Sequence, residues 1–71
     1  MARDICVVLG KRIRQLRTAR GWRQIDLAEQ AGINENYVSD LELGRKEPCL
    51  RTIKALASAL GLTVSEFLNT V

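Results

Sequence analysis

Apolar side chains recur at helical spacing from the start of the chain. In the first twenty residues they stand three or four positions apart, at Ile5, Leu9, Ile13 and Leu16. This period places them on one face of an α-helix, and Gly21 is a typical C-terminal stop. Gly10 lies inside the predicted helix, where glycine costs about 1 kcal/mol relative to alanine. Its presence there predicts a close backbone contact with another helix.

Two short helices with a glycine between them are predicted in the middle of the chain. The first extends over about residues 24–30 and ends at Gly32, whose tolerance of positive φ suits a tight turn. Asn34 then begins the second, because its side chain can accept a hydrogen bond from an orphan backbone N–H. The core-facing side chains of the two helices are Leu27, Ala28, Ala31, Val38 and Leu41. Two short helices joined by such a turn form a helix-turn-helix.

Two further helices are predicted in the last third of the chain. One extends over about residues 50–60, and its apolar face comprises Ile53, Leu56, Ala57 and Leu60. The last begins with a capping box between Thr63 and Glu66 and a hydrophobic staple between Leu62 and Phe67. The pattern therefore predicts five helices, no strands and one compact all-α domain over residues 1–71.

A second apolar stripe is predicted on the last helix. It consists of Val64, Leu68 and Val71, at positions i, i+4 and i+7. So small a bundle has no obvious internal partner for this stripe, because Phe67 already turns toward the core. The stripe is therefore either the surface on which a second copy of the chain docks or a fully internal face.

Composition narrows the functional classes. The chain has no histidine and only two cysteines, Cys6 and Cys49, so the closely spaced ligands of a structural zinc site are absent. General-base catalysis would depend on carboxylates or lysine, and no paired-acid or glycine-cradle motif is present. The longest apolar stretch, residues 5–9, is far shorter than the roughly 20 residues of a membrane span. We therefore expect a cytoplasmic protein that is no enzyme and uses no cofactor, metal, membrane or small-molecule substrate.

Charge is unevenly distributed along the chain. Residues 1–23 contain seven basic residues and one acidic residue, whereas residues 24–44 contain five acidic residues and no basic ones. Residues 45–71 contain four basic and two acidic residues. Two basic zones flanking an acidic middle suggest a polyanionic partner held at its edges. The alternative is a helix face that arginine makes soluble.

An ordered set of motifs surrounds the helix-turn-helix. It consists of Gly21-Trp22-Arg23-Gln24, Leu27-Ala28, Ala31-Gly32-Ile33, Tyr37-Val38-Ser39, Leu41-Glu42, Gly44-Arg45, Pro48 and the closing run 53–68. With these motifs the chain resembles the Cro/CI (XRE-type) helix-turn-helix regulators over about residues 9–68. The resemblance implies a lambda-repressor-like DNA-binding domain that binds a pseudo-palindromic double-stranded operator as a homodimer. Residues 36–42 are most similar to the controller proteins of restriction–modification systems.

The resemblance also implies roles for individual side chains. The base-facing positions are Asn34, Glu35, Asn36, Ser39 and Asp40. The phosphate-contacting positions are Arg23, Gln24, Tyr37, Arg45 and Lys46. The chemistry fits, because asparagine can bind adenine bidentately and a carboxylate can accept from the amino group of cytosine. Arg17 and Glu42 would pair as a structural salt bridge that orients the recognition helix. Tyr37 could instead lie across the helix surface, and the two basic residues after the helix could form a solvated loop.

Three features depart from the family pattern. Arg23 and Cys49 stand where the family usually has a Ser or Thr helix cap, and Asp26 could partly compensate for Arg23. Glu35 and Asp40 would repel phosphates unless they meet cytosine amino groups or water. We therefore expect low non-specific affinity and a sharper dependence on DNA sequence.

Other classes of partner are weaker alternatives. An antitoxin-type module would use the same fold chiefly to bind a partner protein, but only about three residues follow Leu68 to form a segment for it. An RNA-binding protein would need aromatic side chains interleaved with basic ones for base stacking, and these are missing. The sequence thus favours a DNA-binding transcriptional regulator.

Overall fold

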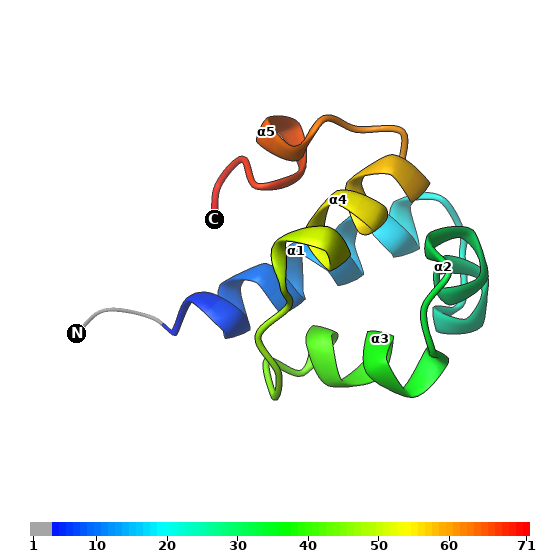
Figure 1. The fold of residues 1–71 in the computed structure, drawn as a ribbon, viewed down its shortest axis with the longest axis horizontal. Helices are drawn as coiled ribbons and strands as arrows, with labels where there is room; N and C mark the ends of the chain where they lie inside the picture. Colours follow the sequence, from blue (N-terminus) through cyan, green and yellow to red (C-terminus); the bar gives the residue numbers. More distant parts are fainter. Residues whose placement is uncertain (1–3) are drawn as a thin grey trace.

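The first helix, α1 (Ile5–Ala19), is capped at its start by Asp4, whose carboxylate accepts a hydrogen bond from the backbone N–H of Cys6 at 2.8 Å. The computed structural model describes residues 4–71, and Figure 1 shows its ribbon. Leu9 and Ile13 are buried on the inward face of α1, as the helical spacing predicts. The predicted first helix is therefore confirmed.

Helices α2 (Gln24–Ala31) and α3 (Glu35–Glu42) are joined by a tight turn, as predicted for the helix-turn-helix. Gly32 provides the turn with a left-handed backbone conformation, at φ 70°. The side chain of Asn34 accepts a hydrogen bond from the backbone N–H of Asn36 at 2.7 Å and caps α3. In Figure 1, α3 lies along the outer edge of the molecule.

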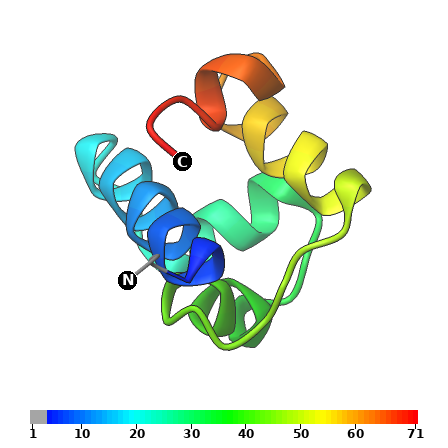
Figure 2. The ribbon, with the colours of Figure 1, turned by 90° about the vertical axis from the view of Figure 1, so that its left-hand side faces the viewer.

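Helices α4 (Leu50–Ala59) and α5 (Val64–Phe67) complete the bundle, and Figures 1 and 2 show them on the side opposite α3. The predicted capping box of α5 is present. The Thr63 hydroxyl accepts from the Glu66 backbone N–H at 3.1 Å, and the Glu66 carboxylate accepts from the Thr63 backbone N–H at 2.9 Å. Hydrogen bonding of the Glu66 carboxylate by the Thr63 backbone N–H, and secondarily by the Thr63 side chain, holds the pKa of Glu66 below its usual value.

The last helix is shorter than the predicted stripe of Val64, Leu68 and Val71 requires. Helix α5 ends at Phe67, and the chain then turns, with Thr70 at φ 77°. The three side chains therefore do not form one helical stripe, and this part of the sequence prediction is wrong. Val64 and Leu68 both pack against the core, and Leu68 and Val71 line a groove beside α1.

The core is aliphatic around a single aromatic ring. Its buried members are Leu9, Ile13, Leu27, Ala28, Val38, Leu41, Leu56, Ala57, Leu60 and Phe67. All five helices contribute to it, and the described residues contain no strand, so the predicted all-α class is confirmed. Ala31 was expected in the core but is only partly buried at the end of α2. Within residues 4–71 no helix has both the length and the hydropathy of a membrane span.

Gly10 marks the closest approach of α1 to α3. A Cβ atom on Gly10 would lie 2.5 Å from the carbonyl oxygens of both Leu41 and Glu42. These are backbone atoms, which cannot move aside as a flexible side chain can. The predicted backbone contact is therefore confirmed, and it fixes the C-terminal end of α3 against α1.

Candidate nucleic-acid interface

The outward face of α3 carries the side chains predicted to face DNA bases. Val38 and Leu41 are 0% and 2% exposed, which fixes the rotation of α3 about its own axis. The residues at the start and on the opposite side of the helix are Asn34, Glu35 and Asn36, which are exposed, and Ser39 and Asp40, which are half-buried. An exposed polar helix face of this kind can enter a major groove.

Asn34 and Asn36 differ in how much of their amide group is free. The Asn34 side-chain oxygen already accepts the capping hydrogen bond from the Asn36 backbone N–H. Bidentate recognition of adenine needs both the oxygen and the amino group of an asparagine. Asn36 therefore has a complete amide available for a base, whereas Asn34 has only its amino group unless the cap is broken.

Lys46 does not extend freely into solvent. Its ammonium group lies 3.3 Å from a carboxylate oxygen of Asp40 and 5.9 Å from the centre of the Tyr37 ring. Tyr37 itself is partly buried and packs against the core. Arg45 is exposed, and its side chain makes no hydrogen bond or ion pair with another described residue. The two basic residues after α3 therefore differ in how readily they can reach a phosphate.

The start of α2 has half of a capping box. The guanidinium group of Arg23 has no acceptor, so it cannot cap the helix. Asp26 instead accepts from the Arg23 backbone N–H at 2.8 Å and pairs with the guanidinium group at 3.1 Å. The side-chain and backbone hydrogen bonds from Arg23 lower the pKa of Asp26, so it stays ionised at neutral pH. The expected compensation is present, and it leaves Arg23 itself largely exposed.

A largely buried ion pair fixes the end of α3. The Glu42 carboxylate accepts from the Arg17 guanidinium group at 2.6 and 3.0 Å and from the Gln24 side-chain amide at 3.2 Å. Arg17 also donates to the backbone carbonyl of Trp22 at 2.7 Å. The side chains of Arg17 and Glu42 are only 12% and 4% exposed. This network joins α1, the start of α2 and the end of α3, so it holds the outward face of α3 in place.

Two other arginines of the basic N-terminal segment are also engaged within the fold. Arg12 donates to the backbone carbonyls of Glu66 and Phe67 at 3.0 and 3.2 Å. Arg20 donates to the carbonyl of Leu60 and lies 5.2 Å from the centre of the Trp22 ring. Sequence reasoning missed these contacts, because nothing in a sequence distinguishes one backbone carbonyl from another. Several of the basic residues in residues 1–23 thus stabilise the fold through contacts within the protein.

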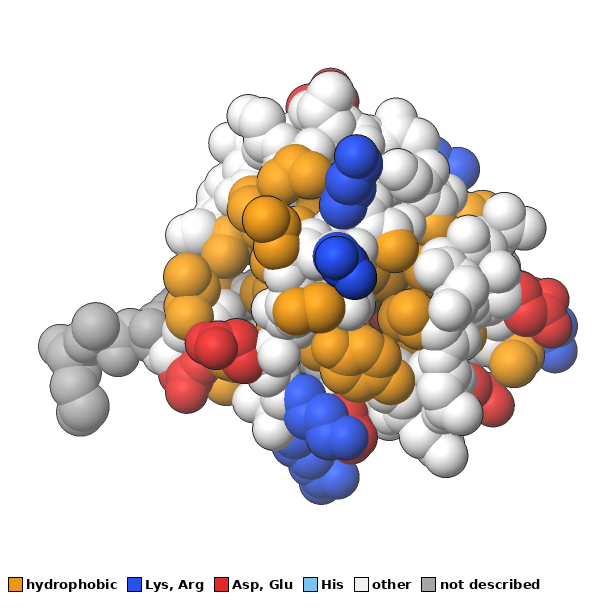
Figure 3. Space-filling view, viewed as in Figure 1, with side chains coloured by type: hydrophobic (Ala, Val, Ile, Leu, Met, Phe, Trp, Pro, Cys, Tyr) orange, Lys and Arg blue, Asp and Glu red, His pale blue; other side chains and the backbone are white. Residues whose placement is uncertain are grey.

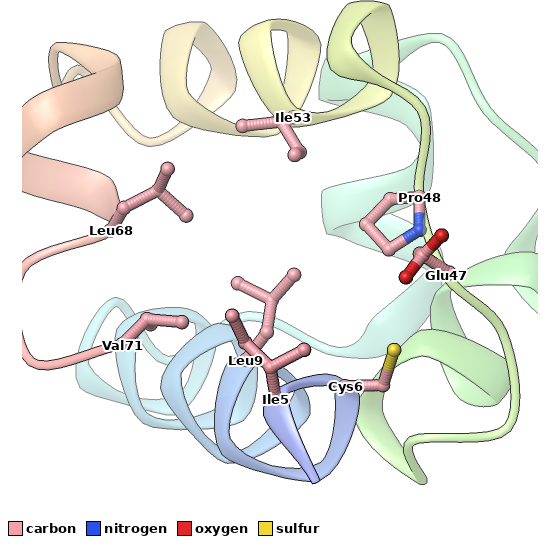
Figure 4. Close-up of a pocket in the computed structure, with 8 residues that line it drawn as sticks. All are labelled: Ile5, Cys6, Leu9, Glu47, Pro48, Ile53, Leu68 and Val71. Atoms are coloured by element: carbon pink, nitrogen blue, oxygen red, sulfur yellow. The ribbon is translucent and has the colours of Figure 1, made fainter.

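An apolar groove lies away from α3, between α1, α4 and the end of the chain. It encloses about 360 Å³ and is lined by Ile5, Cys6, Leu9, Glu47, Pro48, Ile53, Leu68 and Val71 (Figure 4). Figure 3 shows hydrophobic side chains gathered over this part of the surface. Ile5 and Val71 are 61% and 36% exposed, so the groove continues into an exposed apolar surface.

The cysteines do not form a cluster with other ligands. Both Cys6 and Cys49 are free thiols, and within residues 4–71 no group of three or more potential ligands is placed to hold a metal ion. Cys49 gives α4 no side-chain cap, as its replacement of Ser or Thr predicts. Its side chain instead hydrogen-bonds with Thr52 at 3.4 Å, which lowers the pKa of the Cys49 thiol.

Comparison with known proteins supports the same assignment of elements. A family model described as helix-turn-helix matches residues 13–67. The chain is 48% identical over 63 residues to the HTH-type transcriptional regulator DdrOP3 of Deinococcus deserti, covering 89% of this chain and 49% of that protein. It is 41% identical over 59 residues to the immunity repressor protein of Bacillus phage phi105, covering 83% of this chain and 41% of that protein. The chain thus spans about half the length of these curated relatives, or less.

One solved structure is similar over its whole length. The restriction–modification controller protein C.AhdI from Aeromonas hydrophila superposes with a TM-score of 0.87 at 37% sequence identity. The superposition covers 92% of this chain and 98% of the controller protein. The similarity therefore includes the first and last helices as well as the central pair.

Proposed function

The chain belongs to the Cro/CI-type helix-turn-helix family of transcriptional regulators, and on this basis we propose that it recognises a pseudo-palindromic DNA operator as a homodimer. Members of this family regulate transcription and are not enzymes. The observation that carries the proposal is the exposed polar face of α3, held in position by the buried pair of Arg17 and Glu42. We further propose that residues 1–71 act as one DNA-binding domain, in the cytoplasm.

The residues proposed to contact DNA around α3 fall into two groups: base-contacting residues, and phosphate-contacting residues, which we call phosphate anchors. We propose that Glu35, Asn36 and Ser39 contact base edges, with Asn34 and Asp40 at the margins of the same face. The proposed phosphate anchors are Arg23, Gln24, Tyr37 and Arg45, together with Lys46 where its ion pair with Asp40 opens. Base contacts specify a sequence, whereas phosphate contacts fix position and provide salt-dependent affinity. Substitutions in the two groups should therefore have different consequences.

We predict that Asn36→Ala and Arg45→Ala will have different effects, the first on base specificity and the second on salt-dependent affinity for any DNA. Asn36→Ala should weaken operator binding by about 1–3 kcal/mol, relax base preference at one position per half-site and leave the salt dependence nearly unchanged. Arg45→Ala should weaken binding to operator and random duplex alike, and should reduce the salt-dependence slope of a dimer by roughly 2. The measurement is titration of labelled duplexes at several salt concentrations, with the operator first selected from random DNA.

Lys54→Met serves as the control, because it removes a positive charge from the exposed side of α4. It should change neither base preference nor the slope by a comparable amount. If both Asn36→Ala and Arg45→Ala bind both duplexes as the parent does, the groove-facing assignment is wrong. A module that binds a partner protein, as in an antitoxin, then becomes the better interpretation.

The geometry of DNA recognition supports the proposed homodimer. One recognition helix reads only a few base pairs, so useful specificity needs two copies about 34 Å apart on the DNA. The apolar groove offers a surface for the second copy, because Leu68 and Val71 line it together with the exposed Ile5. Val64 does not line this groove, so it contributes less to the proposed surface than the sequence suggested.

We predict that a charge in the groove will break the dimer. Ile5→Asp should give a monomer, because the carboxylate would be buried unpaired between two copies. The substitution should be tolerated in the fold, since Ile5 is exposed in the first turn of α1, where an acidic residue is favourable. Leu68→Asp tests the opposite wall. The measurement is sedimentation equilibrium, with circular dichroism to verify folding.

Leu50→Asp is a matched control, since Leu50 is an exposed first residue of α4 that does not line the groove. It should leave the dimer intact. A parent protein that remains monomeric at tens of micromolar, a concentration that detects weak dimers, even with operator bound, would exclude the homodimer.

The controller proteins of restriction–modification systems are the subfamily we propose. The support is the similarity to C.AhdI, which extends over 98% of that chain, whereas the chain matches about half of the curated relatives named above. Footprinting of DNA upstream of the chain's own gene would test this proposal. A controller protein should protect sites beside genes of a restriction enzyme and its methyltransferase.

A further inference from the structure

Two contacts hold Lys46 against the outward face of α3. Its ammonium group pairs with the Asp40 carboxylate at 3.3 Å and lies 5.9 Å from the centre of the Tyr37 ring. The backbone also favours this arrangement, because the Arg45 N–H donates to the Asp40 carbonyl at 2.9 Å and turns the chain back along the helix. Lys46 is thus engaged on the face that is proposed to meet DNA.

A contact between Lys46 and a DNA phosphate would require the loss of its ion pair with Asp40. The ammonium group would have to leave Asp40, whose side chain is 28% exposed, and the carboxylate would then face the polyanion without a partner. The attraction between Lys46 and the phosphate is therefore offset by repulsion between the unpaired Asp40 carboxylate and the DNA. Arg45 has no such restriction, because its side chain pairs with no described residue.

The same arrangement recurs at the other end of the site. Arg23, a second proposed phosphate anchor, is paired with Asp26 at 3.1 Å. Asp26 also caps α2 through the Arg23 backbone N–H, so its replacement would disturb the helix as well as the charge. Asp40 accepts no such capping bond, and the pair of Asp40 and Lys46 is therefore the cleaner one to test.

We propose that Asp40 and Lys46 form a charge-cancelling pair that limits the affinity of the protein for DNA of arbitrary sequence. Asp40 is then a specificity-determining residue even where its carboxylate contacts no base. Discrimination is a difference between two affinities, and lowering the non-specific one increases it as surely as improving the specific one. The inference rests on the proposed function, because it concerns the same DNA-binding face.

The test is a double-substitution cycle of the parent, Asp40→Asn, Lys46→Met and the double variant, each titrated with a random duplex between 50 and 200 mM salt. In the parent background, Asp40→Asn should release Lys46 to phosphate and increase the salt-dependence slope of the dimer by roughly 2, or about 16-fold in relative affinity across this salt range. In the Lys46→Met background, the same substitution should leave the slope unchanged. Lys54→Met controls for the loss of a lysine elsewhere, and thermal melting verifies that each variant folds.

The possible results separate this inference from the proposed function. If Asp40→Asn increases random-duplex affinity and slope equally in both backgrounds, Asp40 acts by simple repulsion and the pair is refuted. An unchanged slope in the parent background refutes it as well. In both cases, a reduced slope for Arg45→Ala would show that the DNA-binding function stands. A parent that binds no duplex at any salt concentration overturns both. If Asp40→Asn fails to fold, Asp40→Ala tests the same removal of charge.

Discussion

Replacing Glu42 by alanine should lower the free energy of unfolding by about 3 kcal/mol, toward the lower end of the range for breaking a buried ion pair. The physical reason is that the Arg17 guanidinium group loses its carboxylate partner while it stays largely buried. Arg17 is only 12% exposed and would keep its charge with a single remaining partner, the carbonyl of Trp22. The Gln24 amide would lose its acceptor too. Urea denaturation followed by circular dichroism measures the change.

Arg17→Ala should be similarly destabilising, because it leaves the Glu42 carboxylate, 4% exposed, without its main donor. The double variant should be less destabilised than the sum of the two, by about 2 kcal/mol, since neither charge is then left alone. Lys46→Ala is a suitable control, because it breaks an ion pair in which the lysine is 59% exposed, and it should have little effect on stability. Strictly additive losses for Arg17→Ala and Glu42→Ala would show that the two side chains are not paired in solution.

Elements that depend on neighbouring residues could be predicted from the sequence. The Asn34 cap and the capping box of Thr63 and Glu66 connect atoms at most three residues apart. The turn at Gly32 likewise needs only one residue with a left-handed backbone. Because such interactions form wherever the local sequence allows, the sequence alone predicts where α3 and α5 begin.

The end of the chain shows where local patterns fail. Val64, Leu68 and Val71 keep a helical period, yet α5 ends at Phe67 and the next residues turn toward α1. No glycine or proline marks this end in the sequence. The apolar side chains of α1 and α4 that form the groove lie far away along the chain, so periodicity could not reveal that Leu68 and Val71 would line it.

The candidate site was predictable in part for the same reason. The buried positions of Val38 and Leu41 determine which side of α3 faces outward, and that follows from spacing. The resemblance to a family supplied the roles of the outward residues. Neither could show that Lys46 lies on Asp40, because the path of the loop after α3 determines this contact.

A second large effect is expected from Gly10→Ala, although alanine is the better helix former by about 1 kcal/mol. The added Cβ would lie 2.5 Å from the carbonyl oxygens of Leu41 and Glu42 and 2.9 Å from the Glu42 carbonyl carbon. Backbone atoms at the end of a packed helix can move only if α1 and α3 separate. We expect a net loss of about 2–3 kcal/mol in the free energy of unfolding, as for other overpacked sites.

The same steric overlap should also alter the position of the proposed DNA-binding face of α3. Relief of the overlap moves the end of α3 away from α1, and with it the network of Arg17 and Glu42 that holds the outward face in place. Operator affinity should therefore fall even under conditions where Gly10→Ala is fully folded, while Lys11→Ala, at an exposed position next to it in α1, should alter neither stability nor binding appreciably. Urea denaturation and operator titration of the two variants provide both measurements. A Gly10→Ala protein as stable as the parent would mean that α3 does not lie this close to α1, and the outward face would then owe its position to the ion pair alone.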